Sequence, residues 1–143
     1  MDFYFNAASR PQVALKLAAK AFQAGQHALL YTTDEAQAAE LDRLLWTAQQ
    51  LSFVPHVRCG HPLAAETPVL IGAQADELAS PDVLINLTDA APPFYRRFAR
   101  LIEIVGSEEQ DRQQARARYR RYQAEGCELH THDLKQVDGG RPN

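Results

Sequence analysis

The sequence has little cysteine and no long apolar run. Cys59 and Cys127 are the only cysteines among 143 residues, which is too few for a disulfide framework and fits a reducing compartment. The apolar stretches fall short of the roughly 18 residues that a membrane span needs. Residues Met1 to Phe5 lack the basic start and apolar stretch of a signal peptide. We therefore expect a cytoplasmic protein.

A glycine-rich phosphate loop is also missing. Residues 6–11, NAASRP, follow the first predicted strand and contain no glycine. The Cβ atoms of this segment would keep a pyrophosphate away from the backbone amides, which excludes the usual nucleotide site. The chain has neither a Gly-x-Ser-x-Gly elbow nor a catalytic-cysteine signature. These absences predict a protein that has no catalytic site of its own.

Side chains that bind metals occur in two groups, but their spacing is unsuitable. Cys59 and His61 form one group, and Cys127, His130 and His132 form the other. Cys59 and His61 are separated by one residue, as are His130 and His132, whereas zinc knuckles typically have a two-residue gap. We expect these side chains to belong to loops or to an edge strand, and we expect no metal ion and no other cofactor.

Short apolar strands alternate with amphipathic helices along the chain. The predicted strands cover residues 2–6, 27–32, 69–71, 83–87, 101–105 and 127–132, and the predicted helices cover 11–24, 34–46 and 108–125. Such alternation indicates parallel strands with right-handed crossovers. The prediction is a three-layer α/β/α domain with a mainly parallel, mixed-edge sheet and a Rossmann-like topology. This single domain is placed at residues 1–137, and residues 138–143, which lack an apolar anchor, are expected to be disordered.

Lysine is scarce, and arginine is clustered. The chain has three lysines against twelve arginines. Residues 1–93 carry five basic side chains against ten acidic ones, whereas residues 94–122 carry eight arginines against four acids. A GC-rich genome would account for the general preference for arginine but not for its clustering. Because guanidinium groups pair in a plane with carboxylates and phosphates, the cluster predicts an anionic partner.

The last predicted helix presents several of these side chains on one face. Arg112, Arg116, Tyr119 and Arg120 occur at i, i+4, i+7 and i+8. We expect no acid to neutralise the arginines on this face, and no acid lies between Arg112 and Tyr122. Like charges at this spacing repel one another, which indicates a negative partner. A tyrosine ring beside the guanidinium groups suits an acidic peptide with an apolar end. Tyr122 is expected on the core side of the helix.

Two other interpretations of this face stay open. The first is a basic face that only contacts solvent, with Tyr119 and Tyr122 packed on the sheet. The second is a weak single-stranded nucleic-acid-binding module that uses the same arginines. The net charge of −3 and the single basic stripe argue against strong binding to DNA.

A second candidate surface contains two large aromatic residues around an irregular connection. Trp46 ends a predicted helix, and Phe53 lies in the segment that follows. If both side chains are exposed, they form an interaction hot spot, because buried aromatic residues dominate binding energies. The alternative is that both residues cap the core.

Ordered motifs along the chain resemble one known family. They are FYF at 3–5, LLW at 44–46, SFVPH at 52–56, PVLI at 68–71, LINL at 84–87 and ARARYRRY at 115–122, with Gly126 beyond. Taken together and in this order, they resemble the chi subunit of bacterial DNA polymerase III. The resemblance implies an α/β fold and a non-enzymatic accessory subunit of the clamp loader. It also implies a partner, single-stranded DNA-binding protein, whose acidic C-terminal tail ends in Pro-Phe.

The resemblance also assigns roles to individual residues. The tail-binding positions fall on Arg112, Arg116, Tyr119 and Arg120, and Val105 matches the wall of an apolar pocket. The positions matched by Trp46 and Phe53 form the surface for a psi subunit or a helicase-related protein. One departure is Gly106-Ser107, which stands where a Pro-Tyr pair is expected.

Overall fold

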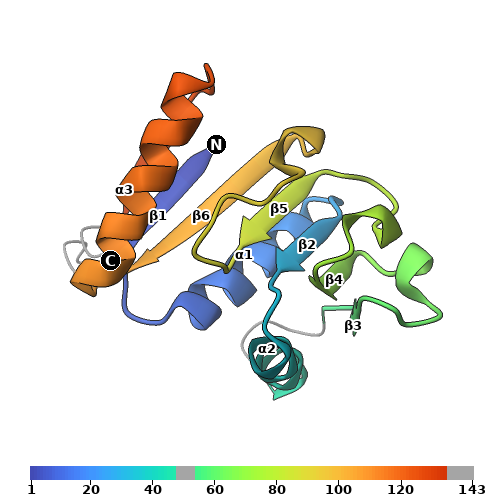
Figure 1. Cartoon of the computed structure of the whole chain (residues 1–143). Coiled ribbons are helices and arrows are strands. Elements are labelled where there is room, and N and C mark those ends of the chain that lie inside the picture. The colour runs from blue at the N-terminus through green and yellow to red at the C-terminus, as the bar shows by residue number, and fades with distance from the viewer. Residues whose placement is uncertain (48–53, 135–143) are drawn as a thin grey trace.

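The computed structural model describes residues 1–47 and 54–134, which form one sheet with helices on both faces (Figure 1). The strands are β1 (Asp2–Ala7), β2 (Ala28–Tyr31), β3 (His56–Arg58), β4 (Val69–Gly72), β5 (Val83–Asn86), β6 (Arg100–Gly106) and β7 (His130–Asp133). The helices are α1 (Arg10–Gln23), α2 (Glu35–Thr47) and α3 (Glu109–Ala124). The predicted three-layer α/β architecture is confirmed. Phe53 and the expected disordered tail at 138–143 lie outside the described residues.

The seven strands follow the order β3-β4-β2-β5-β6-β1-β7. Every neighbouring pair is parallel, including the edge pairs β3–β4 and β1–β7. The antiparallel pairing expected at an edge is therefore not present among the described strands. The crossover through α3 returns the chain to β7 in the same direction as β1, since Asp2 lies opposite His130 and Phe5 opposite Asp133.

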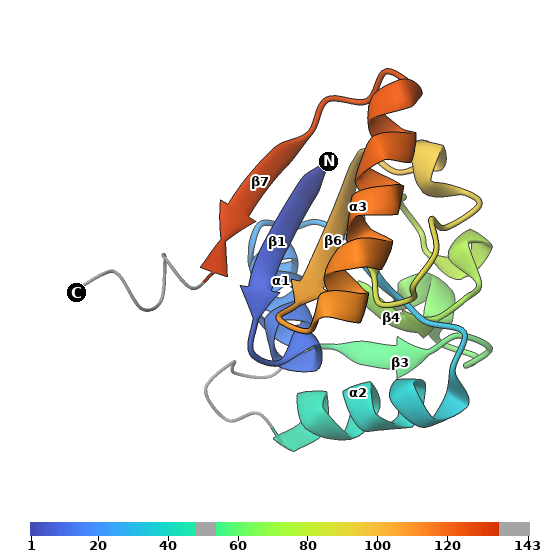
Figure 2. The same cartoon turned by 60° about the vertical axis from the view of Figure 1, so that its left-hand side comes forward.

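Alternate residues of each strand face opposite layers of the domain. One core cluster joins α1 and α2 to one face of the sheet through residues such as Leu30, Ile71 and Ile104. The other cluster joins α3 to the opposite face through Leu29 and Tyr122. Figure 2 shows α3 in front of β1 and β6, α1 behind these strands, and α2 at the lower edge beside β3. This arrangement leaves one long side of α3 beside strand β7.

Short polar side chains begin the first two helices. Ser9 is the N-cap of α1, and its Oγ accepts a hydrogen bond from the Gln12 amide. Asp34 precedes α2, and its carboxylate accepts hydrogen bonds from the Ala36 and Gln37 amides. These bonds satisfy backbone donors that the first helical turn leaves without partners.

The carboxylate of Asp2, on β1, links this strand to both of its neighbours, β6 and β7. The Asp2 carboxylate lies 2.8 Å from Arg100 Nε and 2.9 Å from His132 Nε2. Burial alone would raise the pKa of Asp2, but the hydrogen bonds from His132 and Arg100 lower it below its ordinary value. A lowered carboxyl pKa stabilises the fold above the unfolded value, and this stabilisation is lost as the pH falls through the folded value.

We expect Asp2→Asn to destabilise the protein at neutral pH and to matter less in acid. The melting temperatures of the two proteins should converge as the pH falls from about 5 to about 2, because protonation removes the same charge from the wild type. Thermal melts over this range check the prediction. A difference in melting temperature that does not change with pH would contradict it.

None of the helices in the described part of the chain is long and apolar enough to cross a membrane.

Candidate functional site

Helix α3 is fixed to the sheet by a polar cluster as well as by apolar contacts. Glu103, in the middle of β6, is completely buried, and Arg118 from α3 is 6% exposed. Arg118 Nε donates to Glu103 Oε1 over 3.1 Å, and the Tyr122 hydroxyl donates to Oε2 over 2.6 Å. The side-chain amide of Asn86 donates to both carboxylate oxygens. Arg118 also donates to the Asp89 carbonyl, which links the helix to the loop after β5.

The environment of this cluster sets its protonation. Burial raises the pKa of the Glu103 carboxyl, while Arg118 and the hydrogen bonds from Tyr122 and Asn86 oppose that rise. Burial and the neighbouring Glu103 carboxylate raise the pKa of Tyr122 far above its ordinary range. Tyr122 therefore keeps its proton and donates a hydrogen bond to Glu103. The prediction that Tyr122 belongs to the core is confirmed.

A pocket opens between α3 and the strands β1, β6 and β7. We call it the α3 pocket, and it is lined by Phe3, Phe5, Val105, Arg112, Ala115, Arg116, Tyr119 and Thr131. Its volume is about 320 Å³. The Tyr119 ring packs edge-on against Phe3, with centroids 5.2 Å apart, so the ring is held as part of the wall. The pocket thus combines aromatic and aliphatic walls with two guanidinium groups.

The structure brings together four of the five residues expected to bind a peptide. Val105, Arg112, Arg116 and Tyr119 all line the α3 pocket. Arg120 is exposed on the same helix but does not line the pocket. Sequence reasoning missed Phe3, Phe5, Ala115 and Thr131 as lining residues. The FYF motif was visible, but nothing in a single sequence shows that β1 and β7 lie beside α3.

The arginines are more fully paired than the sequence indicated. Seven of the eight arginines in residues 94–122 have a carboxylate oxygen within 3.9 Å. Only Arg120 has no such ion pair in the part of the chain that the structure describes. On the α3 face itself, Glu109 lies 3.9 Å from Arg112 and 3.5 Å from Arg116. The prediction that no acid neutralises this face is therefore wrong, because Glu109 lies on the same side of the helix, one turn before Arg112 and two turns before Arg116.

Gly106, which stands where the family resemblance led us to expect a proline, has a close neighbour in the structure. A Cβ atom on Gly106 would lie 2.5 Å from Asp111 Oδ2. The Asp111 carboxylate in the first turn of α3 therefore packs directly against Gly106. A larger residue at this position would require the Asp111 side chain to move.

The second predicted surface lies at the other end of the molecule. Trp46 at the end of α2 is 61% exposed, so it does not cap the core. Its ring lies 4.8 Å from the ring of buried His56, whose Nε2 lies 3.2 Å from Asp42 Oδ1. The Trp46 side chain is therefore positioned against β3 while most of its surface faces solvent. Phe53, its predicted neighbour, is outside the described residues.

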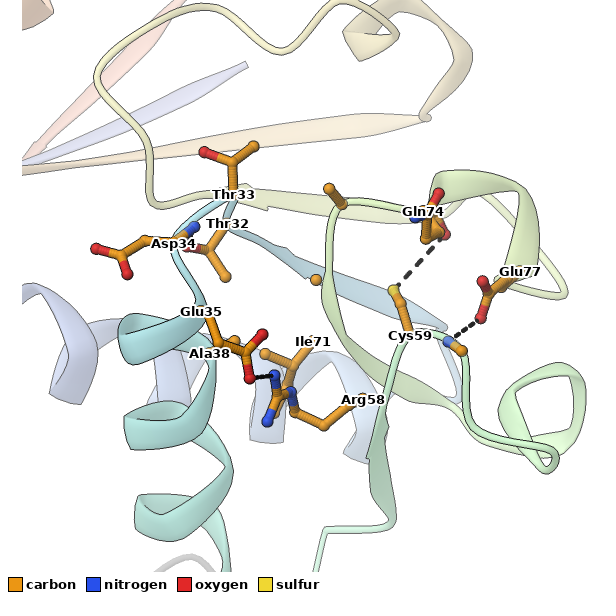
Figure 3. A pocket seen from close by; sticks show the side chains of 13 residues that line it. Thr32, Thr33, Asp34, Glu35, Ala38, Arg58, Cys59, Ile71, Gln74 and Glu77 are labelled. Carbon is orange, nitrogen blue, oxygen red and sulfur yellow. Dashed lines mark hydrogen bonds and ion pairs between the residues drawn. The ribbon is translucent and has the colours of Figure 1, made fainter.

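Another cavity, of about 260 Å³, lies at the carboxyl ends of β2, β3 and β4, where related sheets often bind ligands (Figure 3). Its charged lining residues are Asp34, Glu35, Glu77 and a single cation, Arg58, which pairs with Glu35. This balance disfavours a phosphate, and the start of α2 is already capped by Asp34.

Burial raises the pKa of the Cys59 thiol in the same cavity, so it is a poor nucleophile. Within residues 1–47 and 54–134, no three His, Cys, Asp or Glu side chains are placed to hold a metal ion.

Solved structures with a similar fold include those of yeast Dbp5. The chain aligns with Saccharomyces cerevisiae Dbp5 L327V bound to Nup159, Gle1 H337R, IP6 and ADP at a TM-score of 0.65 and 11% identity. It aligns with Dbp5 bound to RNA and ADP BeF3 at a TM-score of 0.61 and 13% identity. In each case the alignment covers nearly the whole chain, 96% and 97%, but only 43% of the Dbp5 chain. At this level of identity the likeness concerns the fold alone.

Sequence relatives are more specific. Residues 1–130 match the family model described as DNA polymerase III chi subunit, HolC. The chain is 38% identical to the DNA polymerase III subunit chi of Pseudomonas aeruginosa, over 96% of this chain and 98% of that one. It is 33% identical to the Escherichia coli subunit of the same name, over 84% and 82% of the two chains. The chain therefore belongs to the DNA polymerase III chi subunit family, a family of replication accessory subunits.

Proposed function

We propose that this chain is a non-catalytic accessory subunit of the DNA polymerase III clamp-loader assembly that binds the acidic C-terminal tail of single-stranded DNA-binding protein. The observation that carries the proposal is the α3 pocket, in which an apolar floor adjoins two guanidinium groups. A peptide that ends in an apolar ring and carries acids before it matches both halves of this site. The pocket size is in the range of small-ligand sites, which suits one side chain and its neighbours.

The pocket gives the two kinds of contact different roles. Phe3, Phe5, Val105 and Tyr119 remove the terminal apolar side chain of the peptide from water. Arg112 and Arg116 receive carboxylates at the rim, because planar guanidinium groups pair with them bidentately. Arg120, exposed on the next turn, extends the positive surface for acids further from the end of the tail.

The layout of the domain supports a linking role. The α3 pocket lies beside β7, whereas Trp46 lies at the end of α2 near β3, and β7 and β3 are opposite edges of the sheet. Helices α2 and α3 also pack on opposite faces (Figure 2). Two partners therefore bind without competing for space. We assign the Trp46 surface, with Phe53, to a psi subunit or a helicase-related protein.

The pairing of the arginines disfavours the nucleic-acid alternative. Phosphate backbones are bound by extended areas of unpaired positive charge. Here, seven arginines already lie near carboxylates in the described residues, and Arg120 is the exception. An apolar pocket between the helix and the sheet also has no role in gripping phosphates.

Arg116→Ala should weaken binding of an acidic peptide that ends in Pro-Phe by about 5- to 20-fold, since one charged contact at the rim is lost. Isothermal titration calorimetry at low salt measures this. Arg43→Ala is the matched control, because Arg43 is 60% exposed against 58% for Arg116 and also lies near a helical glutamate. Arg43 is on α2, on the opposite face of the sheet, so its removal changes the net charge equally without touching the pocket.

Salt provides an independent check on the same site. Binding should weaken as NaCl rises, because exposed charge pairs are screened over about 10 Å at 0.1 M salt. Equal affinities for Arg116→Ala and Arg43→Ala would rule out the rim as the carboxylate site. Tight binding of a mixed-sequence oligonucleotide together with no binding of the peptide would favour the nucleic-acid alternative.

A further inference from the structure

Glu109 is paired with Arg112 and Arg116, the two arginines that the proposed ligand would bind. Its Oε1 lies 3.9 Å from Arg112 Nη1, and its Oε2 lies 3.5 Å from Arg116 Nη1. The three residues follow one side of α3 at i, i+3 and i+7, so one carboxylate is shared between two successive arginines. The chain thus supplies an internal acid at the rim where carboxylates of a peptide would enter.

We propose that Glu109 is an internal competitor for the α3 pocket, which an acidic ligand must displace before it pairs with Arg112 and Arg116. This inference rests on the proposed function and adds a reason why the pocket would select ligands that carry several acids. With Glu109 in place, the rim carries a net charge of about +1 from these three groups at neutral pH. A ligand with one acid gains little by exchanging one carboxylate for another. A ligand with several acids pairs with both arginines and with Arg120.

The displaced carboxylate has other partners in its own helix. Gln113 Nε2 donates to Glu109 Oε2 over 3.3 Å, and Glu109 is the first residue of α3. An acid in the first turn is stabilised by the unpaired amides of the helix end. Glu109 therefore gives up the arginines at small cost. The contact is also weak at the start, because Glu109 is 61% exposed and Arg116 is 58% exposed.

The neighbouring residue offers a matched control. Glu108 is an exposed acid at the N-cap position of α3, and its side chain makes no capping hydrogen bond. It forms no ion pair within the described part of the chain. Glu108→Gln and Glu109→Gln each remove one negative charge at the same end of the same helix. Only Glu109→Gln frees the two arginines, so any difference between the variants reports the local contact.

Calorimetry with the same acidic, Pro-Phe-ended peptide tests the inference. We expect Glu109→Gln to bind about 2- to 5-fold more tightly than the wild type at low salt, the range that an exposed ion pair supports. Glu108→Gln should differ from the wild type by less than about 1.5-fold, and the advantage of Glu109→Gln should shrink in high salt. Circular dichroism melts of both variants check that α3 stays folded.

The outcomes separate this inference from the proposed function. If the wild type does not bind the peptide, the proposed function fails and the competitor has no ligand. If the wild type binds and Arg116→Ala weakens it, but both glutamine variants behave alike, only the role of Glu109 is overturned. A selective gain for Glu109→Gln at unchanged melting temperature supports the competition.

Discussion

Arg118→Met should lower the free energy of unfolding by about 3–5 kcal/mol, because it leaves a buried carboxylate without its cation. Arg118 and Glu103 are 6% and 0% exposed, and their hydrogen-bonded atoms are 3.1 Å apart. Methionine keeps most of the aliphatic stem, so little of the loss comes from an empty space. Denaturant titration at neutral pH measures the change. The effect is large for a domain whose total stability is of the order of 5–15 kcal/mol.

The pH dependence distinguishes the lost charge from lost packing. Arg118 opposes the rise that burial imposes on the pKa of Glu103, so its removal raises the folded pKa further. A raised carboxyl pKa favours the fold at pH values below it, where the carboxyl is protonated. The deficit of Arg118→Met relative to the wild type should therefore shrink as the pH falls. A deficit of equal size at every pH would show that packing, not charge, is the cause.

Two further variants complete this test. Arg121→Met changes an exposed arginine on the same helix that pairs with Glu125, and it should cost less than about 1 kcal/mol. Combining Glu103→Gln with Arg118→Met should recover part of the loss, because an amide needs no cation and its oxygen still accepts from Tyr122. No recovery in the double variant would contradict the role assigned to the buried charge.

The sequence predicted the layers because hydrophobic periodicity reports local structure directly. The helix expected at 108–125 is observed at Glu109–Ala124, and the apolar runs became buried parallel strands. The position of β7 beside β1 could not be predicted, since pairing between strands far apart in the chain leaves no local pattern. For the same reason, the contribution of Phe3 and Thr131 to the pocket was not visible.

Arg118 illustrates that the sequence alone does not show which charged side chains are buried. By composition it belonged to a positive cluster, yet the structure buries it against Glu103. One signal was available, because an acid inside the apolar strand LIEIV requires a buried partner. The partner itself could not be chosen among eight nearby arginines without knowing which side of α3 faces the sheet. Helical spacing did correctly group Arg112, Arg116 and Tyr119.

The pairing of the arginines changes the basis of the functional inference. From the sequence, a negative partner was inferred because no acid was expected to neutralise the arginines of this face. Glu109 pairs with two of them, so that argument no longer holds. The pocket now carries the inference, because apolar walls and guanidinium groups converge in it from four elements, β1, β6, β7 and α3. A site assembled from several elements specifies a ligand more narrowly than a charged stripe does, since both the shape and the charge of the ligand must match.

Tyr119→Ala should weaken binding of the acidic, Pro-Phe-ended peptide by about 30-fold, or roughly 2 kcal/mol. Tyr119 forms the wall of the α3 pocket nearest to Phe3, with ring centroids 5.2 Å apart. Removing it opens the pocket to water, so the terminal ring of the peptide is no longer buried. Calorimetry at one salt concentration measures the loss, and a melting curve shows whether α3 remains packed.

Tyr119→Phe is the matched control, and it should bind within about 2-fold of the wild type if the ring acts as an apolar wall. A second peptide, with its final phenylalanine replaced by alanine, closes a double-mutant cycle with Tyr119→Ala. If the two rings touch, the combined loss is smaller than the sum of the single losses. Strict additivity, with each variant folded, would place the end of the peptide elsewhere. The pocket would then serve only to seat α3, and the carboxylates bound by Arg112 and Arg116 would have to account for recognition alone.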